Sequence, residues 1–168
     1  KTRVEEWDAM LESSKDENTL TKIKNVNDFF NKITYKSDLS VWGIKDYWAT
    51  PFEFMGVGAG DCEDYAIAKY FSLIKLGIPD EKLRITYVSY KKANSKFEQA
   101  HMVLTYYHKI GVEPVVLDNI DKTLQVASKR TDLKPVYSFN ASGLWQAKTK
   151  GEARVGNNEL KSWKDLMS

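Results

Sequence analysis

The sequence has a single cysteine, no long apolar run and almost no excess of charge. One cysteine excludes an internal disulfide, so cysteine pairing says nothing about the redox compartment. No stretch approaches the roughly 18 apolar residues that a membrane-spanning helix needs, so we expect no membrane insertion. The 25 basic and 23 acidic residues leave a net charge of +2. That balance does not suggest a nucleic-acid-binding protein, which carries a concentrated basic excess.

The remaining composition is that of a globular protein. Hydrophobic residues make up 42% and charged residues 29% of the chain, which excludes a disordered or fibrous chain. A length of 168 residues is enough for one hydrophobic core, so we expect a single domain over residues 1–168. The chain begins Lys1-Thr2-Arg3, with no initiator methionine and no apolar signal segment. We expect either a trimmed chain or a mature form whose export signal has been removed.

The first half of the chain predicts helices. Apolar residues at spacings of three and four indicate two amphipathic helices between Val4 and Ile33, separated near residues 13–18. Residues 35–59 are rich in aromatic side chains and are interrupted by proline and glycine, which predicts a structured loop region. A third helix is predicted to enter at Gly60-Asp61 and to end near Gly77, with Pro79 two positions later.

The second half predicts strands. Alternating sequences of β-branched and aromatic residues indicate four of them, at 84–90, 101–108, 114–117 and 136–140. Residues 91–99 read as a polar hairpin loop. Helices followed by consecutive strands with short links predict an α+β fold, in which the N-terminal helices and the third helix accompany a mostly antiparallel sheet.

The single cysteine, Cys62, lies at the predicted start of the third helix. Backbone N–H groups and the dipole at a helix N-terminus favour a thiolate, the nucleophilic form of cysteine. The carboxylates of Asp61, Glu63 and Asp64 act in the opposite direction, because neighbouring negative charge raises the pKa of a thiol. A neutralising group is therefore expected, either a cationic histidine or a bound metal ion. A buried, unreactive cysteine is the alternative.

Two histidines are available as a base. His101 starts a predicted strand and Asp118 ends the next one, and an antiparallel pair of strands can bring the two together. With Cys62 facing the other imidazole nitrogen, the three residues would form a triad of nucleophile, base and orienting carboxylate. His108 is seven positions further along, so a regular strand would direct it to the opposite face, as a surface histidine.

The string Gly60-Asp61-Cys62-Glu63-Asp64 carries a more specific signal. It follows Trp48-Ala49-Thr50-Pro51, and it precedes His101 and Leu117-Asp118-Asn119. Over about residues 42–119 these motifs resemble the bacterial transglutaminase-like cysteine proteinases, and more narrowly the LapG-type periplasmic proteases. The resemblance implies a papain/transglutaminase-like fold. It also implies that Cys62 is the nucleophile, His101 the general base and acid, and Asp118 the orienting carboxylate.

The resemblance further implies calcium dependence, with the acidic residues beside the nucleophile as ligands. The side chains of Asp61 and Glu63 fit this role, because hard oxygen donors suit Ca²⁺ and suit zinc poorly. A divalent ion there would offset the negative charge that opposes the thiolate. Asp64 is a weaker candidate, since an acidic residue in the first turn also complements the helix dipole. The sequence has no EF-hand pattern, so we expect an irregular site completed by backbone carbonyls and water.

The implied reaction is hydrolysis of a peptide bond through a thioester. LapG-type proteases cut near the N-terminus of a large surface adhesin in the periplasm, which releases the adhesin and promotes biofilm dispersal. The implied inhibitor is a LapD-type inner-membrane receptor, which sequesters the protease when cyclic di-GMP is high. Trp48 is a candidate for the oxyanion site or substrate cleft, because an indole N–H can donate. Aromatic packing is its alternative.

Two other functions are compatible with the same residues. A transglutaminase or amidase would resolve the acyl-enzyme with an amine instead of water, and the triad does not separate this from proteolysis. A non-catalytic binding module would leave Cys62 merely buried. We would expect the sequence of such a module to lack a triad residue, and none is missing.

Overall fold

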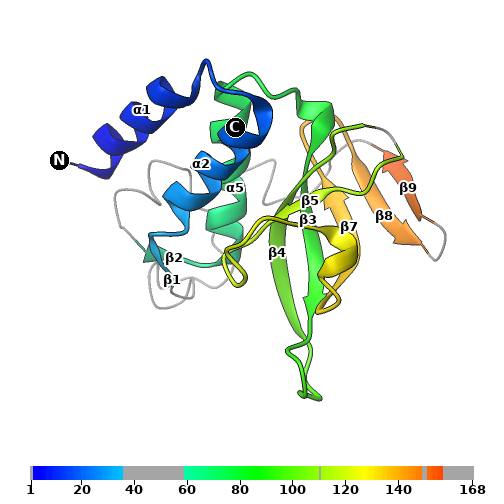
Figure 1. The fold of residues 1–168 in the computed structure, drawn as a ribbon. Coiled ribbons are helices and arrows are strands. Elements are labelled where there is room, and N and C mark those ends of the chain that lie inside the picture. The colour runs from blue at the N-terminus through cyan, green and yellow to red at the C-terminus, as the bar shows by residue number, and fades with distance from the viewer. Residues whose placement is uncertain (1, 36–58, 110, 149–150, 157–168) are drawn as a thin grey trace.

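The computed structural model describes residues 2–35, 59–109, 111–148 and 151–156. It places the helices together on one side and the larger sheet on the other (Figure 1). The bounds of the helices are α1, Arg3–Ser14; α2, Thr19–Phe30; and α5, Cys62–Lys75. Two short 3-10 helices are η1, Asp80–Lys82, and η2, Ala127–Lys129.

Among the described residues, seven strands form one sheet in the order β6-β5-β4-β3-β7-β8-β9. Every neighbouring pair in it is antiparallel. The bounds are β3, Leu83–Tyr90; β4, Gln99–Tyr106; β5, Val115–Leu117; β6, Gln125–Val126; β7, Leu133–Phe139; β8, Leu144–Lys148; and β9, Gly151–Gly156. A separate parallel pair joins β1, Thr34–Tyr35, to β2, Ala59–Gly60. The predicted α+β class with a mostly antiparallel sheet is confirmed.

The two N-terminal helices form where the apolar spacing predicts them. Thr2 caps α1, since its hydroxyl accepts from the Glu5 N–H at 3.2 Å. Asn18 caps α2, since its side-chain oxygen accepts from the Thr21 N–H at 2.8 Å. Such caps satisfy N–H groups that have no partner inside the first turn. The Asn18 cap begins α2 directly after the break between the two helices, within the range that the sequence predicts.

Helix α5 begins at Cys62, with Asp61 as the N-cap residue. The Asp61 N–H donates to the Asp64 carboxylate at 3.1 Å, which fixes the entry of the chain into the helix. At the other end Gly77 has φ +90, a left-handed conformation that glycine adopts without a Cβ clash. The Ile78 N–H then donates back to the Leu73 carbonyl at 3.0 Å. The helix start that the sequence predicts for the cysteine is therefore confirmed.

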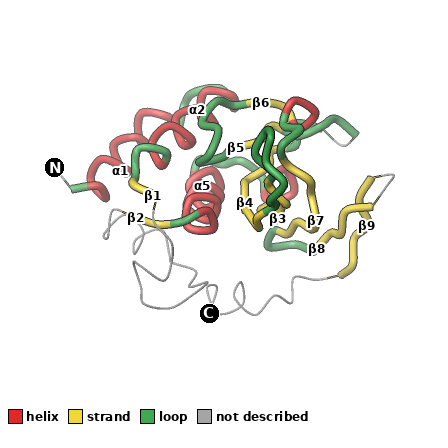
Figure 2. The backbone as a smooth tube through the Cα atoms, turned by 90° about the horizontal axis from the view of Figure 1, so that it is seen from below, coloured by secondary structure: helices red, strands yellow, loops and turns green. Residues whose placement is uncertain are grey.

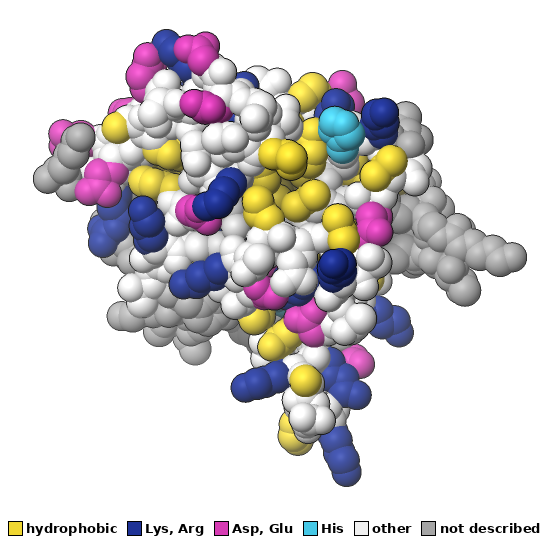
Figure 3. Space-filling view, viewed as in Figure 1, with side chains coloured by type: hydrophobic (Ala, Val, Ile, Leu, Met, Phe, Trp, Pro, Cys, Tyr) yellow, Lys and Arg dark blue, Asp and Glu magenta, His cyan; other side chains and the backbone are white. Residues whose placement is uncertain are grey.

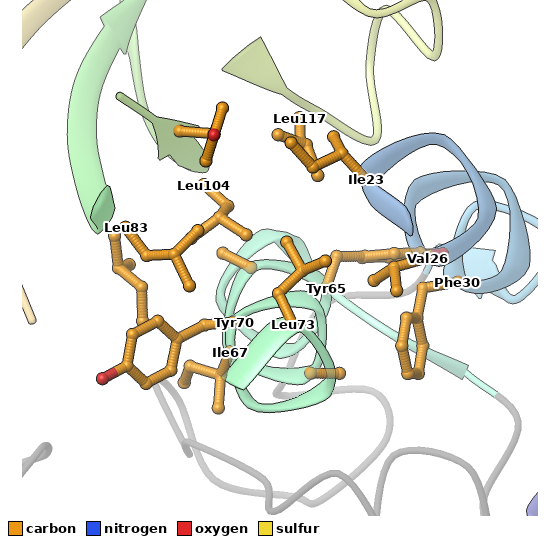
Figure 4. Close-up of a cluster of buried hydrophobic side chains, with 14 of the residues drawn as sticks. Ile23, Val26, Phe30, Tyr65, Ile67, Tyr70, Leu73, Leu83, Leu104 and Leu117 are labelled. Carbon is orange, nitrogen blue, oxygen red and sulfur yellow. The ribbon is translucent and has the colours of Figure 1, made fainter. Parts of the chain in front are cut away.

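Helix α5 lies between α2 and the sheet, as the view from below shows (Figure 2). The main core fills both contacts, and its side chains come from α2, α5 and the three strands β3, β4 and β5 (Figure 4). The labelled members are Ile23, Val26, Phe30, Tyr65, Ile67, Tyr70, Leu73, Leu83, Leu104 and Leu117. Because α5 is packed on both sides, its N-terminus is held at a fixed place beside β4.

The β3–β4 hairpin projects from the body of the molecule (Figures 1 and 3). Its loop carries three lysines and the exposed side chain of Phe97. The predicted polar loop at 91–99 is confirmed, with β4 beginning at its last residue. His101 is the third residue of β4, close to the loop end of the two strands and opposite Val88 of β3.

Two strand predictions need correction. The strand predicted at 101–108 runs from Gln99 to Tyr106, so His108 lies beyond its end, where it is exposed. The strand predicted at 136–140 begins at Leu133 and includes Pro135. A proline is tolerated there because β7 pairs only with β3 at that point, next to a register shift. The strands β6, β8 and β9 were not predicted.

No helix of the described residues is long and apolar enough to cross a membrane.

The packing of α5 generates a stability prediction. Leu73 is 0% exposed in the main core, whereas Leu20 on α2 is 63% exposed. Leu73→Ala should lower the free energy of unfolding by about 2–5 kcal/mol, because it removes buried surface and leaves a cavity. Leu20→Ala is the matched control and should change it by less than about 0.5 kcal/mol. Urea unfolding measures both, and equal losses would contradict this packing.

Candidate active site

His101 and Asp118 are in direct contact at the end of β5. The pairing of β4 with β5 places Leu104 opposite Leu117. Asp118 is the next residue after β5, and the chain leaves the sheet there, beside His101. The Nε2 atom of His101 lies 2.6 Å from Oδ1 of Asp118, and both side chains are buried. A carboxylate can only accept, so Nε2 carries a proton, and Nδ1 is the nitrogen left for a third group.

The Asp118 carboxylate has partners on both oxygens. Oδ1 also accepts from the Ile120 N–H at 3.1 Å, and Oδ2 lies 2.7 Å from Nη2 of Arg130. Burial alone would raise the pKa of this carboxyl, but the hydrogen bonds and charges of His101 and Arg130 outweigh it. They hold the pKa of Asp118 well below its usual range, so the group is ionised at neutral pH.

Arg130 joins Asp118 to a second carboxylate. Its side chain is 3% exposed. Nη2 and Nε reach the Asp132 carboxylate at 2.9 and 3.1 Å. Burial lowers the pKa of Arg130, but the two carboxylates reverse that effect and raise the pKa above its ordinary value. The guanidinium is therefore a permanent cation against the back of Asp118.

Cys62 lies beside the strand that carries His101. The backbone of Met102, the residue after His101, hydrogen-bonds the half-buried thiol. On its other side, Sγ is 3.3 Å from Oε2 of Glu63. Burial raises the pKa of the Cys62 thiol, Glu63 and Asp61 raise it further, and the Met102 hydrogen bond only partly offsets them. Burial and the two carboxylates together therefore disfavour the thiolate in this arrangement.

Asp61 and Glu63 are the two candidate cation ligands that flank the thiol. They are 8% and 6% exposed, and buried carboxylates of like sign are stabilised by a cation. Their hard oxygen donors fit Ca²⁺. Within the described residues, no group of three or more His, Cys, Asp or Glu side chains could hold a metal ion. A complete site would therefore need oxygens from backbone carbonyls, water or the remaining residues. Asp64 lies in the first turn of α5 and accepts the Asp61 N–H, a local capping contact that was not predicted.

The sequence pattern of the bacterial transglutaminase-like cysteine proteinases matches residues 4–147. The chain belongs to this family. Its structure is similar to calcium-bound LapG of Legionella pneumophila, with 44% identity and a TM-score of 0.85 over 98% of this chain and 87% of LapG. EGTA-treated LapG of the same organism is 43% identical, with a TM-score of 0.85 over 98% of this chain and 86% of LapG. A further structure of this LapG is 43% identical, with a TM-score of 0.84 over 98% of this chain and 86% of LapG. A comparison with curated proteins gives no match.

The family, the transglutaminase-like fold and the enzyme class inferred from the sequence are thus confirmed: the chain is a LapG-like cysteine protease. Of the residues singled out, His101 and Asp118 are in contact, and Cys62 is next to β4, the strand of His101. His108 is exposed and apart from them, near the Tyr106 hydroxyl. Trp48 lies outside the described residues.

A buried chain of polar side chains behind Asp118 was not predicted from the sequence. The Lys69 amine donates to Oδ1 of Asn31 at 2.9 Å, and Nδ2 of Asn31 donates to the Asp118 carbonyl at 2.8 Å. Lys69 comes four residues after Tyr65 and four before Leu73, so helical spacing alone puts it on the apolar face of α5. That signal was available for Lys69. Nothing in the sequence around Arg130 marked its contact with Asp118.

Lys69 generates a pH prediction. Burial lowers its pKa from 10.5 to about 7, although Asp118 and Asp28 oppose the shift. Between these two values the unfolded chain binds more protons than the folded one, so the free energy of unfolding rises with pH across that window. Lys69→Met removes this group. The stability of the wild type relative to Lys69→Met should therefore increase from about pH 7 toward pH 10. Parallel curves in denaturant titrations would contradict the burial of a titrating amine.

Proposed function

We propose that this LapG-like protease cuts a peptide bond near the N-terminus of a large surface adhesin in the periplasm, and that Cys62, His101 and Asp118 are its catalytic triad. One observation carries the proposal. His101 on β4 forms a buried pair with Asp118 at 2.6 Å, and the next residue of β4, Met102, hydrogen-bonds the thiol of the only cysteine. The likeness to LapG over 98% of the chain supports the substrate class.

In the first half of the reaction, Nδ1 of His101 takes the proton of the Cys62 thiol. The sulfur then attacks the scissile carbonyl carbon, and the new oxyanion faces the backbone N–H of Cys62 at the helix start. That N–H is free of the helical ladder, because the first turn of a helix has no acceptor for its donors. Nδ1 next gives its proton to the leaving amine as the C–N bond breaks, which leaves a thioester.

In the second half, water resolves the thioester. Nδ1 of His101 takes a proton from the attacking water, the C–S bond breaks, and the proton returns to sulfur. Throughout, Nε2–H stays bound to ionised Asp118, which fixes the tautomer and stabilises the imidazolium. Trp48 is the second oxyanion donor or cleft residue we propose, from its place in the motif before Pro51.

We further propose that Ca²⁺ is held by Asp61 and Glu63. The support is the pair of buried carboxylates beside the thiol and the calcium-bound form of the similar LapG. When bound, the ion would supply positive charge that offsets these carboxylates and so permits a thiolate. Glu63 would then direct its carboxylate to the ion instead of to the sulfur.

The proposed partners follow the same resemblance. The adhesin is the protein substrate, and a LapD-type inner-membrane receptor is the proposed inhibitor under the control of cyclic di-GMP. If the adhesin is cut between residues with small side chains, a narrow substrate cleft in the protease would suit it.

Cleavage of an adhesin N-terminal fragment tests the proposal. Wild type with calcium should produce two fragments, which mass spectrometry identifies. Cys62→Ser and His101→Gln should lose at least about 1,000-fold in rate, because they remove the nucleophile or the base. A calcium-selective chelator should have a similar effect on the wild type and should be reversed by added calcium.

Each arm separates one part of the proposal. Cleavage by Cys62→Ser would exclude the thiol nucleophile, and full activity in chelator would exclude the calcium requirement. Cross-linked products in place of fragments would identify a transglutaminase.

A further inference from the structure

We propose that Arg130 is a positioning residue of this protease: it binds Oδ2 of Asp118 and thereby keeps Oδ1 directed at Nε2 of His101. The inference rests on the triad proposed above. It is carried by a contact that the triad itself does not require, the 2.7 Å ion pair between Nη2 of Arg130 and Oδ2 of Asp118.

The geometry leaves the carboxylate little freedom. Oδ1 is bound by His101 at 2.6 Å and by the Ile120 N–H at 3.1 Å, and Oδ2 is bound by Arg130. The Asp118 backbone carbonyl is held from the other side by Asn31 at 2.8 Å. Rotation of the carboxylate would break at least one charge-assisted hydrogen bond between buried groups. Arg130 is the partner that makes the two oxygens inequivalent.

Arg130 is itself anchored on both its side chain and its backbone. The Asp132 carboxylate accepts hydrogen bonds from Nε and Nη2 of Arg130, at 3.1 and 2.9 Å. The Arg130 N–H donates to the Ala127 carbonyl at 3.0 Å, and its carbonyl accepts from Leu133 at 3.1 Å. The Asp132 carbonyl accepts from Lys91 at the end of β3, at 2.9 Å. The cation therefore sits in a frame tied to the same hairpin that carries His101.

The charges require such a cation. Asp118 must stay ionised to stabilise a protonated His101, and burial opposes ionisation. When His101 is neutral, Arg130 still supplies a full positive charge to the carboxylate. A lysine could supply the charge, but its single nitrogen lacks the planar fork that reaches Asp118 and Asp132 together.

A double-mutant cycle distinguishes positioning from a general structural role. Arg130→Gln should lower kcat for adhesin-fragment cleavage by about 10–100-fold, with KM within about twofold. In an Asp118→Asn background the same change should cost less than about threefold, because the residue through which it acts is already altered. Arg130→Lys should fall between wild type and Arg130→Gln. Arg84→Gln, on β3, is the control for loss of another arginine, and it should leave kcat within about twofold.

A spectroscopic readout needs no substrate. In protein labelled with ¹⁵N-histidine, the buried Nε2–H of His101 should give a low-field proton resonance that exchanges slowly with water. His108 is exposed and should give none. Arg130→Gln, shown to be folded by circular dichroism, should broaden or shift this resonance and speed its exchange, and Arg130→Lys should do so less.

The two readouts keep the inference and the proposed function apart. If the wild type cleaves no adhesin fragment, the proposed substrate is wrong, and the resonance still decides the role of Arg130. An unchanged resonance in folded Arg130→Gln would overturn the inference. So would equal losses of kcat in the wild-type and Asp118→Asn backgrounds.

Discussion

An ionised carboxylate can remain buried only where cations and N–H donors surround it, and this condition shapes the centre of the molecule. Asp118 meets it with His101 and the Ile120 N–H on one oxygen and Arg130 on the other. These partners come from β4, from the turn after β5 and from the residue that follows η2. The contact therefore ties segments far apart in the sequence, and it fixes the orientation of the His101 imidazole.

The second constraint is the place of the cysteine. The N-terminus of α5 is the source of the backbone donor that we propose for the oxyanion, and packing between α2 and the sheet keeps that end beside β4. The same turn carries Asp61 and Glu63, whose charges raise the pKa of the thiol. A cation that offsets the two carboxylates would ease ionisation of the thiol. That is the chemical purpose, beyond holding the fold, of the calcium we propose.

Much of this could be predicted from local sequence. Helix α5 and its start at Cys62 follow from an acidic N-cap, an apolar stripe and Gly77, because capping and periodicity act over a few residues. His101 and Asp118 follow from their places at the ends of adjacent strands. The start of β7 was missed, because Pro135 argues against a strand and is accommodated only by the pairing of its neighbours. Arg130 was missed because its contact with Asp118 depends on how a loop folds back.

The rate of alkylation of Cys62 tests most directly whether His101 acts on the thiol of Cys62. Because the chain has one cysteine, intact-mass spectrometry after timed exposure to iodoacetamide reports that residue alone. With calcium at neutral pH, the wild type should be alkylated at least about tenfold faster than His101→Gln, since the thiolate is the reactive form. Equal rates in the two folded proteins would contradict a catalytic pair.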